Sequence, residues 1–179
     1  MADTTEKLIV RADRKMFYGV EGSNSTPTYT RMKGFTSLTE SKNPIEYSRH
    51  YVDEEFERTD VTGMSSSYDF QFDLLEPNSV LTDMAGIIDG EKLGSDAVRS
   101  FVCVDFHKPV SGQDGQFEAV ERQYSIIGDS VGDGTDALVY SGTLRVQTKR
   151  VTGKATVATP TGGDKNTVET VTFTADSGE

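Results

Sequence analysis

The segment from residue 68 to residue 74 alternates strictly between apolar and polar side chains. The apolar positions are Tyr68, Phe70, Phe72 and Leu74, and the polar ones are Asp69, Gln71 and Asp73. Successive side chains of a strand point to opposite faces of a sheet, so this period of two predicts a half-buried β-strand. Its apolar face packs on a core and its acidic face meets water. The chain must therefore supply neighbouring strands and a single core layer.

Similar strand patterns cover most of the chain. We predict strands at residues 16–20, 29–35, 45–52, 99–106, 117–127, 138–151, 155–159 and 168–175. Residues 101–104 read Phe-Val-Cys-Val, which is typical of a strand covered on both faces. In the strand at 117–127, Val120, Tyr124 and Ile126 share a face. Gly142 is expected to mark a bulge or a close approach, and the last two strands to form a hairpin around a turn at 160–164.

One helix is predicted at about residues 79–90. Apolar residues recur there near i, i+3, i+4 and i+7, Asn78 or Ser79 precedes them as a cap, and Gly90 follows. The fold class is therefore mainly β, a single-domain β-sandwich or barrel (residues 16–175) with one flanking α-helix and a long inter-strand loop. Residues 1–15 are expected to form an N-terminal arm that orders on contact, and residues 176–179 a flexible C-terminus.

Net charge excludes two kinds of partner. The chain has 18 Lys and Arg against 29 Asp and Glu, a formal charge of −11. Specific nucleic-acid binding needs clustered cations, and an anionic membrane repels an acidic surface, so neither is expected as a binding partner. The apolar run at residues 8–10 is too short for a secretory signal, and no stretch is long enough to span a membrane. We expect synthesis in a reducing cytoplasm.

Few residues are candidates for catalysis or metal binding. Cys103 and His107 are four residues apart on one predicted strand, about 13 Å, which is beyond hydrogen-bond or metal-ligand reach. Cys103 is expected to be a buried structural thiol, and His50 is the other histidine. The segment 128–136 is rich in Gly and Asp but lacks the calcium-loop spacing, so it is interpreted as a turn, with a weak cation site as the alternative. We expect no enzyme activity, no metal and no cofactor.

Carboxylates are concentrated in the long loop. The cluster consists of Asp53, Glu54, Glu55, Glu57 and Asp60, with Arg58 among them. Neighbouring carboxylates can act as a general acid and base. A solvated loop or a partner-facing surface explains five acids within eight residues more simply, and we adopt that interpretation.

Several short motifs follow one another along the chain in an order that can be compared with known families. They are residues 43–47 (NPIEY), 51–54 (YVDE), 58–63 (RTDVTG), 67–70 (SYDF), the helix after Glu76-Pro77, Ala119 in its strand, 132–134 (GDG) and 172–175 (TFTA). Together they resemble the major tail tube proteins of long-tailed, siphovirus-type phages of Gram-positive hosts, over roughly residues 30–175. None of the motifs is specific by itself. Their order along the chain carries the resemblance.

The resemblance implies a tail-tube β domain whose copies form stacked hexameric rings around a conduit for DNA. It implies that the loop at about residues 37–67 reaches a neighbouring subunit, and that the family has no catalytic residues. The candidate lumen-facing acids, chosen from strand position and charge, are Asp69, Asp73, Glu118 and Glu121. The expected partners are other copies, the tape measure, tail terminator and distal tail proteins, and DNA in transit without specific binding. The expected location is the virion tail, assembled in the host cytoplasm.

Two alternatives remain. The first is a β-sandwich module that binds a glycan or a protein. The absence of Trp, and aromatic residues at core-like alternating positions, argue against an exposed aromatic platform. The second is a tube or connector subunit of a contractile tail.

Overall fold

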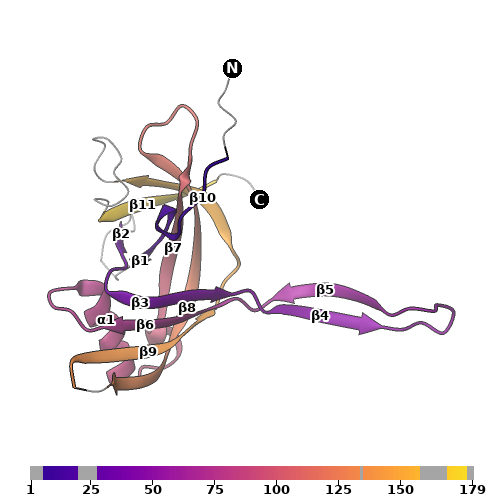
Figure 1. Cartoon of the computed structure of the whole chain (residues 1–179), viewed down its shortest axis with the longest axis horizontal. Helices are drawn as coiled ribbons and strands as arrows, with labels where there is room; N and C mark the ends of the chain where they lie inside the picture. Colours follow the sequence, from indigo (N-terminus) through magenta and orange to yellow (C-terminus); the bar gives the residue numbers. More distant parts are fainter. Residues whose placement is uncertain (1–5, 20–27, 134, 158–168, 177–179) are drawn as a thin grey trace. The chain divides into compact units, whose positions relative to one another are not determined.

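The computed structural model describes residues 6–19, 28–133, 135–157 and 169–176. These residues are mainly β-strand, with one α-helix among them (Figure 1). They form two compact units. The barrel unit comprises residues 1–33, 99–123 and 148–179, and the sheet unit comprises residues 34–98 and 124–147. Strand β8 passes from the first unit into the second after Gln123.

The barrel unit is a closed ring of strands. Its members are β1 (Arg14–Gly19), β2 (Thr28–Arg31), β7 (Val98–Pro109), β8 (Gln116–Asp133), β10 (Val151–Val157) and β11 (Thr170–Ala175). They are hydrogen-bonded in the order β10-β11-β2-β1-β7-β8, and β8 pairs again with β10, which closes the ring. Closure removes open strand edges, which would otherwise invite pairing with other chains. A short 3-10 helix, η1 (Arg11–Asp13), precedes β1.

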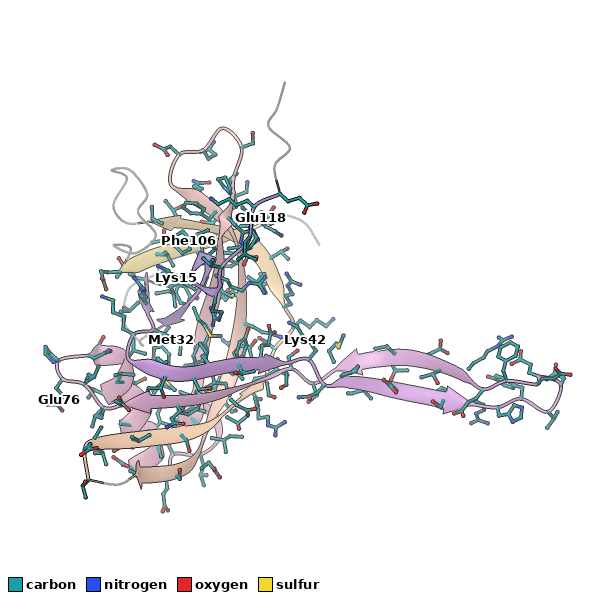
Figure 2. All side chains as sticks on the ribbon, viewed as in Figure 1. Lys15, Met32, Lys42, Glu76, Phe106 and Glu118 are labelled. Carbon is teal, nitrogen blue, oxygen red and sulfur yellow. The ribbon has the colours of Figure 1, made fainter. Side chains whose placement is uncertain are left out.

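The barrel core is formed by side chains from every strand of that ring. The fully enclosed residues are Phe17, Tyr29, Val102, Val104, Ala119, Ala155, Val157 and Val171, with Phe106, Phe117 and Phe173 packed against them. The predicted β10–β11 hairpin pairs as expected, with Ala155 opposite Phe173. Its predicted turn at 160–164 lies outside the described residues. Lys15 lies over the ring of Phe106, 5.6 Å from its centroid (Figure 2).

The sheet unit is a four-strand layer with a helix. The end of β8 pairs with β9 (Ala137–Val146), β9 with β6 (Ser67–Asp73), and β6 with β3 (Phe35–Ser41). Helix α1 (Ser79–Asp89) buries Val80, Leu81, Met84 and Ile87. The sheet side chains enclosed in this unit are Tyr68, Phe70, Phe72, Tyr124, Ile126, Tyr140 and Leu144. A second 3-10 helix, η2 (Gly94–Ala97), precedes β7.

Local sequence explains the helix ends. The Asn78 side chain accepts hydrogen bonds from the backbone N–H groups of Val80 (3.1 Å) and Leu81 (3.3 Å), which makes Asn78, and not Ser79, the N-cap. Gly90 is the C-cap, as predicted. The Tyr140 hydroxyl donates to Asp89 at 2.8 Å and ties the end of the helix to β9. The flanking helix and the alternating strand β6 are therefore confirmed.

The segment predicted as a long loop is mostly a β-hairpin. Strands β4 (Pro44–Arg49) and β5 (Arg58–Met64) pair with each other in a separate two-stranded sheet and continue from the ends of β3 and β6 (Figure 1). The sequence predicted the first of these strands, at residues 45–52, within the long inter-strand segment, but it did not predict the second. Strand β5 escaped prediction because Val61 and Met64 are its only large apolar residues, so its sequence shows no regular alternation.

Two smaller expectations also need correction. The segment 128–136 is not a wide turn, since β8 continues to Asp133 with register shifts after Gly128 and Val131. Cys103 is half-buried and not enclosed, because it lies opposite Met16 on the face of β7 away from the barrel core. In the first half of β8 the buried face carries Ala119, so the face shared by Val120, Tyr124 and Ile126 is buried only in the second half of the strand.

Candidate functional site

The β4–β5 hairpin exposes almost all of its side chains. Every residue of the two strands is exposed except Gly63, which is half-buried. The large apolar side chains left open on the strands are Ile45, Tyr47, Val61 and Met64. Figure 2 labels Lys42 where the chain enters the hairpin, and the side chains beyond it extend on both sides of the two strands. An isolated two-stranded hairpin is marginally stable in water, so this one needs a covering surface.

The hairpin tip is ordered by its own contacts. Arg58 forms an ion pair with Glu54, whose backbone N–H donates to the Tyr51 carbonyl at 3.1 Å. A ring nitrogen of His50 lies 2.7 Å from the Glu54 carbonyl oxygen. These contacts fix a turn while leaving Tyr51, Val52 (fully exposed) and Phe56 (65% exposed) open to solvent.

The predicted loop acids separate into two groups at this tip. Glu54 is half-buried and paired with Arg58, so it shapes the turn. Asp53, Glu55 and Glu57 are exposed at the tip, and Asp60 is exposed on β5 opposite Tyr47. The tip therefore presents an acidic and apolar surface with a defined shape.

One face of the sheet unit is polar. Across three strands, Thr39 lies opposite Asp69 and Asp69 opposite Thr143, while Ser37 lies opposite Gln71 and Gln71 opposite Ser141. The Thr143 hydroxyl donates to Asp69 at 3.0 Å. A shallow hollow on this face is lined by Ser37, Asp69, Gln71, Asp129, Ser141 and Thr143. We call this surface the polar sheet face.

Two of the four candidate lumen acids lie on that face. Asp69 and Asp73 are on the same side of β6, and Asp129 of β8 shares the hollow with Asp69. Sequence reasoning missed Asp129 because its segment was interpreted as a turn. Continuing the strand past Gly128 would have placed it in a sheet.

Glu118 and Glu121 have other surroundings. They are three residues apart on β8, hence on opposite faces of the strand. Glu118 is exposed and lies 3.1 Å from the Lys108 ammonium. Glu121 is half-buried and accepts a hydrogen bond from the Tyr29 hydroxyl inside the barrel unit.

The Tyr29–Glu121 pair changes the titration of the phenol. Burial raises the pKa of Tyr29 far above its usual value of 10.0, and the hydrogen bond to Glu121 and the charge of that carboxylate raise it further. The hydroxyl therefore remains a donor at all physiological pH values. Glu121 acts as a structural acceptor in this unit.

The residues considered for chemistry are not brought together into a catalytic or metal site. Cys103 and His107 are both half-buried on β7, and His107 Nδ1 is a buried ring nitrogen without a hydrogen-bond partner among the described residues. The described ranges contain no group of three His, Cys, Asp or Glu side chains placed to hold a metal ion. In the same ranges, no helix has the length and apolarity needed to cross a bilayer.

Comparison with known proteins supports the fold. No family of known sequences and no curated protein matches this chain. The chain is similar to the SPP1 tail tube, solved as a hybrid of solid-state NMR and cryo-EM, with a TM-score of 0.54 and 14% identity over 81% of this chain and 78% of that one. It is also similar to a chain of the anti-feeding prophage baseplate, with a TM-score of 0.44 and 8% identity over 86% of this chain and 99% of that one. The first likeness confirms a mainly β fold of the phage tail tube type.

Proposed function

We propose that this chain is a structural subunit of a phage tail, without enzymatic activity, that assembles with copies of itself into a tube. The observation that carries the proposal is the exposed, internally ordered β4–β5 hairpin on a fold shared with the SPP1 tail tube. A hairpin with this much open apolar surface is stabilised when another chain covers it. The assembly loop predicted at about residues 37–67 is this hairpin, with the end of β3.

The tube is built from stacked hexameric rings. A ring of identical subunits needs head-to-tail contacts that close, so each subunit must offer two different surfaces. The hairpin is one of these surfaces. The free edge of β3, the end strand of the sheet unit among the described residues, is unpaired and available to a neighbour. The N-terminal arm adds a further contact through Leu8, Ile9 and Val10, which are exposed.

The polar sheet face lines the lumen. Asp69, Asp73 and Asp129 present carboxylates there, among hydroxyl groups that hydrate well and offer no cation to phosphate. Six copies of a chain with net charge −11 carry −66, so the ring repels DNA at short range although salt screens the repulsion beyond about 8–10 Å. Glu118 remains a weaker candidate for the lumen, because it forms an ion pair with Lys108. Glu121 is no longer proposed for the lumen, because it accepts a hydrogen bond from Tyr29.

The remaining partners follow from that role. The tape measure protein would occupy the lumen during assembly, and the tail terminator and distal tail proteins would cap the two ends. DNA passes through without specific binding. The subunit is made in the host cytoplasm and resides in the virion tail.

The test is concentration-dependent assembly of the purified chain. Light scattering coupled to size exclusion, together with negative-stain electron microscopy, should show rings or tubes as concentration rises. A tail initiator complex is added where spontaneous nucleation is slow. Monomers at every concentration, with and without initiator, would contradict the proposal.

A further inference from the structure

A compact basic surface lies on this acidic chain, between β9 and β10. Lys149 and Arg150 are exposed in the connection at residues 147–150, and Arg122 of β8 lies beside it. Arg122 Nε donates to the Thr148 carbonyl at 2.9 Å, and the Gln123 backbone N–H donates to the Thr148 hydroxyl at 3.0 Å. These two bonds hold the connection against β8. We call Arg122, Lys149 and Arg150 the basic knob.

The basic knob lacks acidic partners within the described part of the chain. The ion pairs there include those of Arg14, Lys33, Lys42, Arg58 and Lys108 with carboxylates. The last register pair of β10 with β8 is Val151 opposite Glu121, and Arg150 and Arg122 are the chain neighbours of these two residues. Glu121, the nearest acid along β8, is occupied by Tyr29.

The hairpin tip has the complementary composition. Asp53, Glu55 and Glu57 are exposed carboxylates for which the described residues provide no cation, because Arg58 is engaged by Glu54. The apolar side chains of Val52 and Phe56 stand among these acids, and the exposed Val151 stands beside the basic knob. The tip is held in one conformation by its own contacts, so little ordering entropy is lost when it docks.

We propose that the acidic hairpin tip of one subunit docks on the basic knob of a second copy, with Val52 and Phe56 packing against Val151. This inference rests on the proposed function and names the surface that receives the hairpin. A second copy is the occupant because its charges complement the tip, and because a tube subunit meets other copies at high local concentration. The contact would neutralise the knob and cover the open apolar side chains in one step.

Charge reversal tests the pairing directly. Glu55→Lys with Glu57→Lys reverses the tip, and Lys149→Glu with Arg150→Glu reverses the knob. Each double substitution should raise the critical concentration for assembly by up to about fivefold for each ion pair lost. The quadruple variant restores opposite charges and should return to within about threefold of the wild-type value. Lys92→Glu, at an exposed cation elsewhere, is the matched control and should leave assembly unchanged.

The outcomes separate the inference from the function on which it rests. If both double variants remain folded by circular dichroism and lose assembly, but the quadruple variant is not rescued, the hairpin is an assembly element and the basic knob is not its receptor. If the two double variants assemble as the wild type does, the docking is overturned while a tube subunit remains supported. Wild-type protein that never assembles overturns both proposals.

A cross-link provides a second test that needs no charge change. In a Cys103→Ser background, Val52→Cys and Val151→Cys together should form intermolecular disulfides on mild oxidation of the assembled protein. The product should be a ladder of covalent oligomers on a non-reducing gel. Pairing Val52→Cys with Leu93→Cys, an exposed apolar position beside the end of α1, is the control. A ladder from the Leu93 pair and none from the Val151 pair would place the tip elsewhere and overturn the inference.

Discussion

At the residue scale, two glycines of the sheet unit differ in the space that surrounds them. A Cβ added at Gly142 would lie 2.2 Å from the Ile127 carbonyl oxygen and 2.7 Å from Phe70 Cζ, whereas one added at Gly86 would meet nothing within 4 Å. Gly142 lies between Phe70 of β6 and Gly128 of β8 in the strand register. The backbone approaches too closely there for any side chain.

We therefore expect Gly142→Ala to lower the free energy of unfolding by about 1–3 kcal/mol, because the strands must move apart to admit the methyl group. Gly86→Ala, in the exposed middle of α1, should raise it by about 0.5–1 kcal/mol through helix propensity. Urea unfolding of both variants measures the two changes. Equal effects of the same sign would show that Gly142 is not a close-approach site.

Tyr29 and Glu121 give a pH-dependent prediction. Burial, with the hydrogen bond and charge of Glu121, raises the pKa of Tyr29 above the value of about 10 that it has in the unfolded chain. Below pH 10 the hydroxyl is protonated in both states and its contribution to stability is constant. Above pH 10 the unfolded chain releases this proton and the folded chain keeps it, so stability falls as pH rises.

Tyr29→Phe should lower the free energy of unfolding by about 1–3 kcal/mol at pH 8, because the half-buried Glu121 carboxylate loses its hydrogen-bond donor. The difference in the free energy of unfolding between wild type and variant should become smaller as pH rises from 10 to 11, because only the wild type loses the contribution of the Tyr29 proton. Urea titrations at pH 8, 9, 10 and 11 measure that difference. A gap that stays constant over this range would mean that the Tyr29 pKa is not raised in the folded state.

Single residues could be predicted wherever the local sequence determines the structure. Asn78 as a possible cap and Gly142 as a close approach both follow from local rules on capping and on glycine in strands. The prediction that Cys103 is buried was wrong, because its exposure depends on what covers the outer face of β7. The surroundings of Glu121 likewise depend on Tyr29, which is 92 residues away in sequence.

At the element scale, β8 shows why strand patterns alone were insufficient. Its first half sends Phe117 and Ala119, at odd positions, into the barrel core, and its second half buries Tyr124 and Ile126, at even positions. A strand shared by two units thus changes its buried face along its length. The alternation rule correctly placed Val120, Tyr124 and Ile126 on one face, but it could not show that the opposite face is the buried one in the first half of the strand.

The hairpin is the element most easily separated from the fold. Replacing residues 50–57 by Asn-Gly would join Arg49 to Arg58, which are already paired in register, by a two-residue turn that suits a β-hairpin. The deleted residues lie outside the described cores, so the melting temperature should stay within about 2 °C of wild type. Assembly should be lost, as measured by sedimentation velocity.

This variant shows whether the hairpin tip stabilises the fold of the subunit or acts in assembly. A matched control shortens the connection between β7 and β8 at the exposed residues 111–114, and should leave assembly intact. Tubes formed by the tip-deleted chain at the wild-type critical concentration would contradict the assigned role of the tip.

At the scale of the whole molecule, charge is distributed according to the proposed roles. The formal charge of −11 is spread over many surfaces, whereas Arg122, Lys149 and Arg150 gather at one place. A uniformly acidic subunit would repel its copies, so assembly needs local cations at the contacts and acids toward the lumen. The net charge could be calculated from the composition. The grouping of cations from β8 and from the β9–β10 connection could be recognised only in the three-dimensional fold.

The lumen assignment leads to a test in whole particles. Asp69→Lys with Asp73→Lys changes the charge of the polar sheet face by four per subunit while keeping the two positions hydrophilic and outside the core. Assembly should persist, since neither side chain belongs to the hairpin or the basic knob. DNA ejection should slow by about tenfold or more, because lysines on the wall bind phosphates that the native carboxylates repel.

The measurement is the release of DNA from phage particles whose tails carry the variant subunit, followed with a fluorescent intercalating dye after receptor triggering. Asp114→Lys, in the exposed turn between β7 and β8, alters charge away from the polar sheet face and serves as the control. Raising the salt concentration should partly restore the rate in the double variant, since screening weakens lysine–phosphate attraction. Ejection at the wild-type rate from fully assembled variant tails would remove Asp69 and Asp73 from the lumen, and the conduit would have to be lined by another face of the subunit.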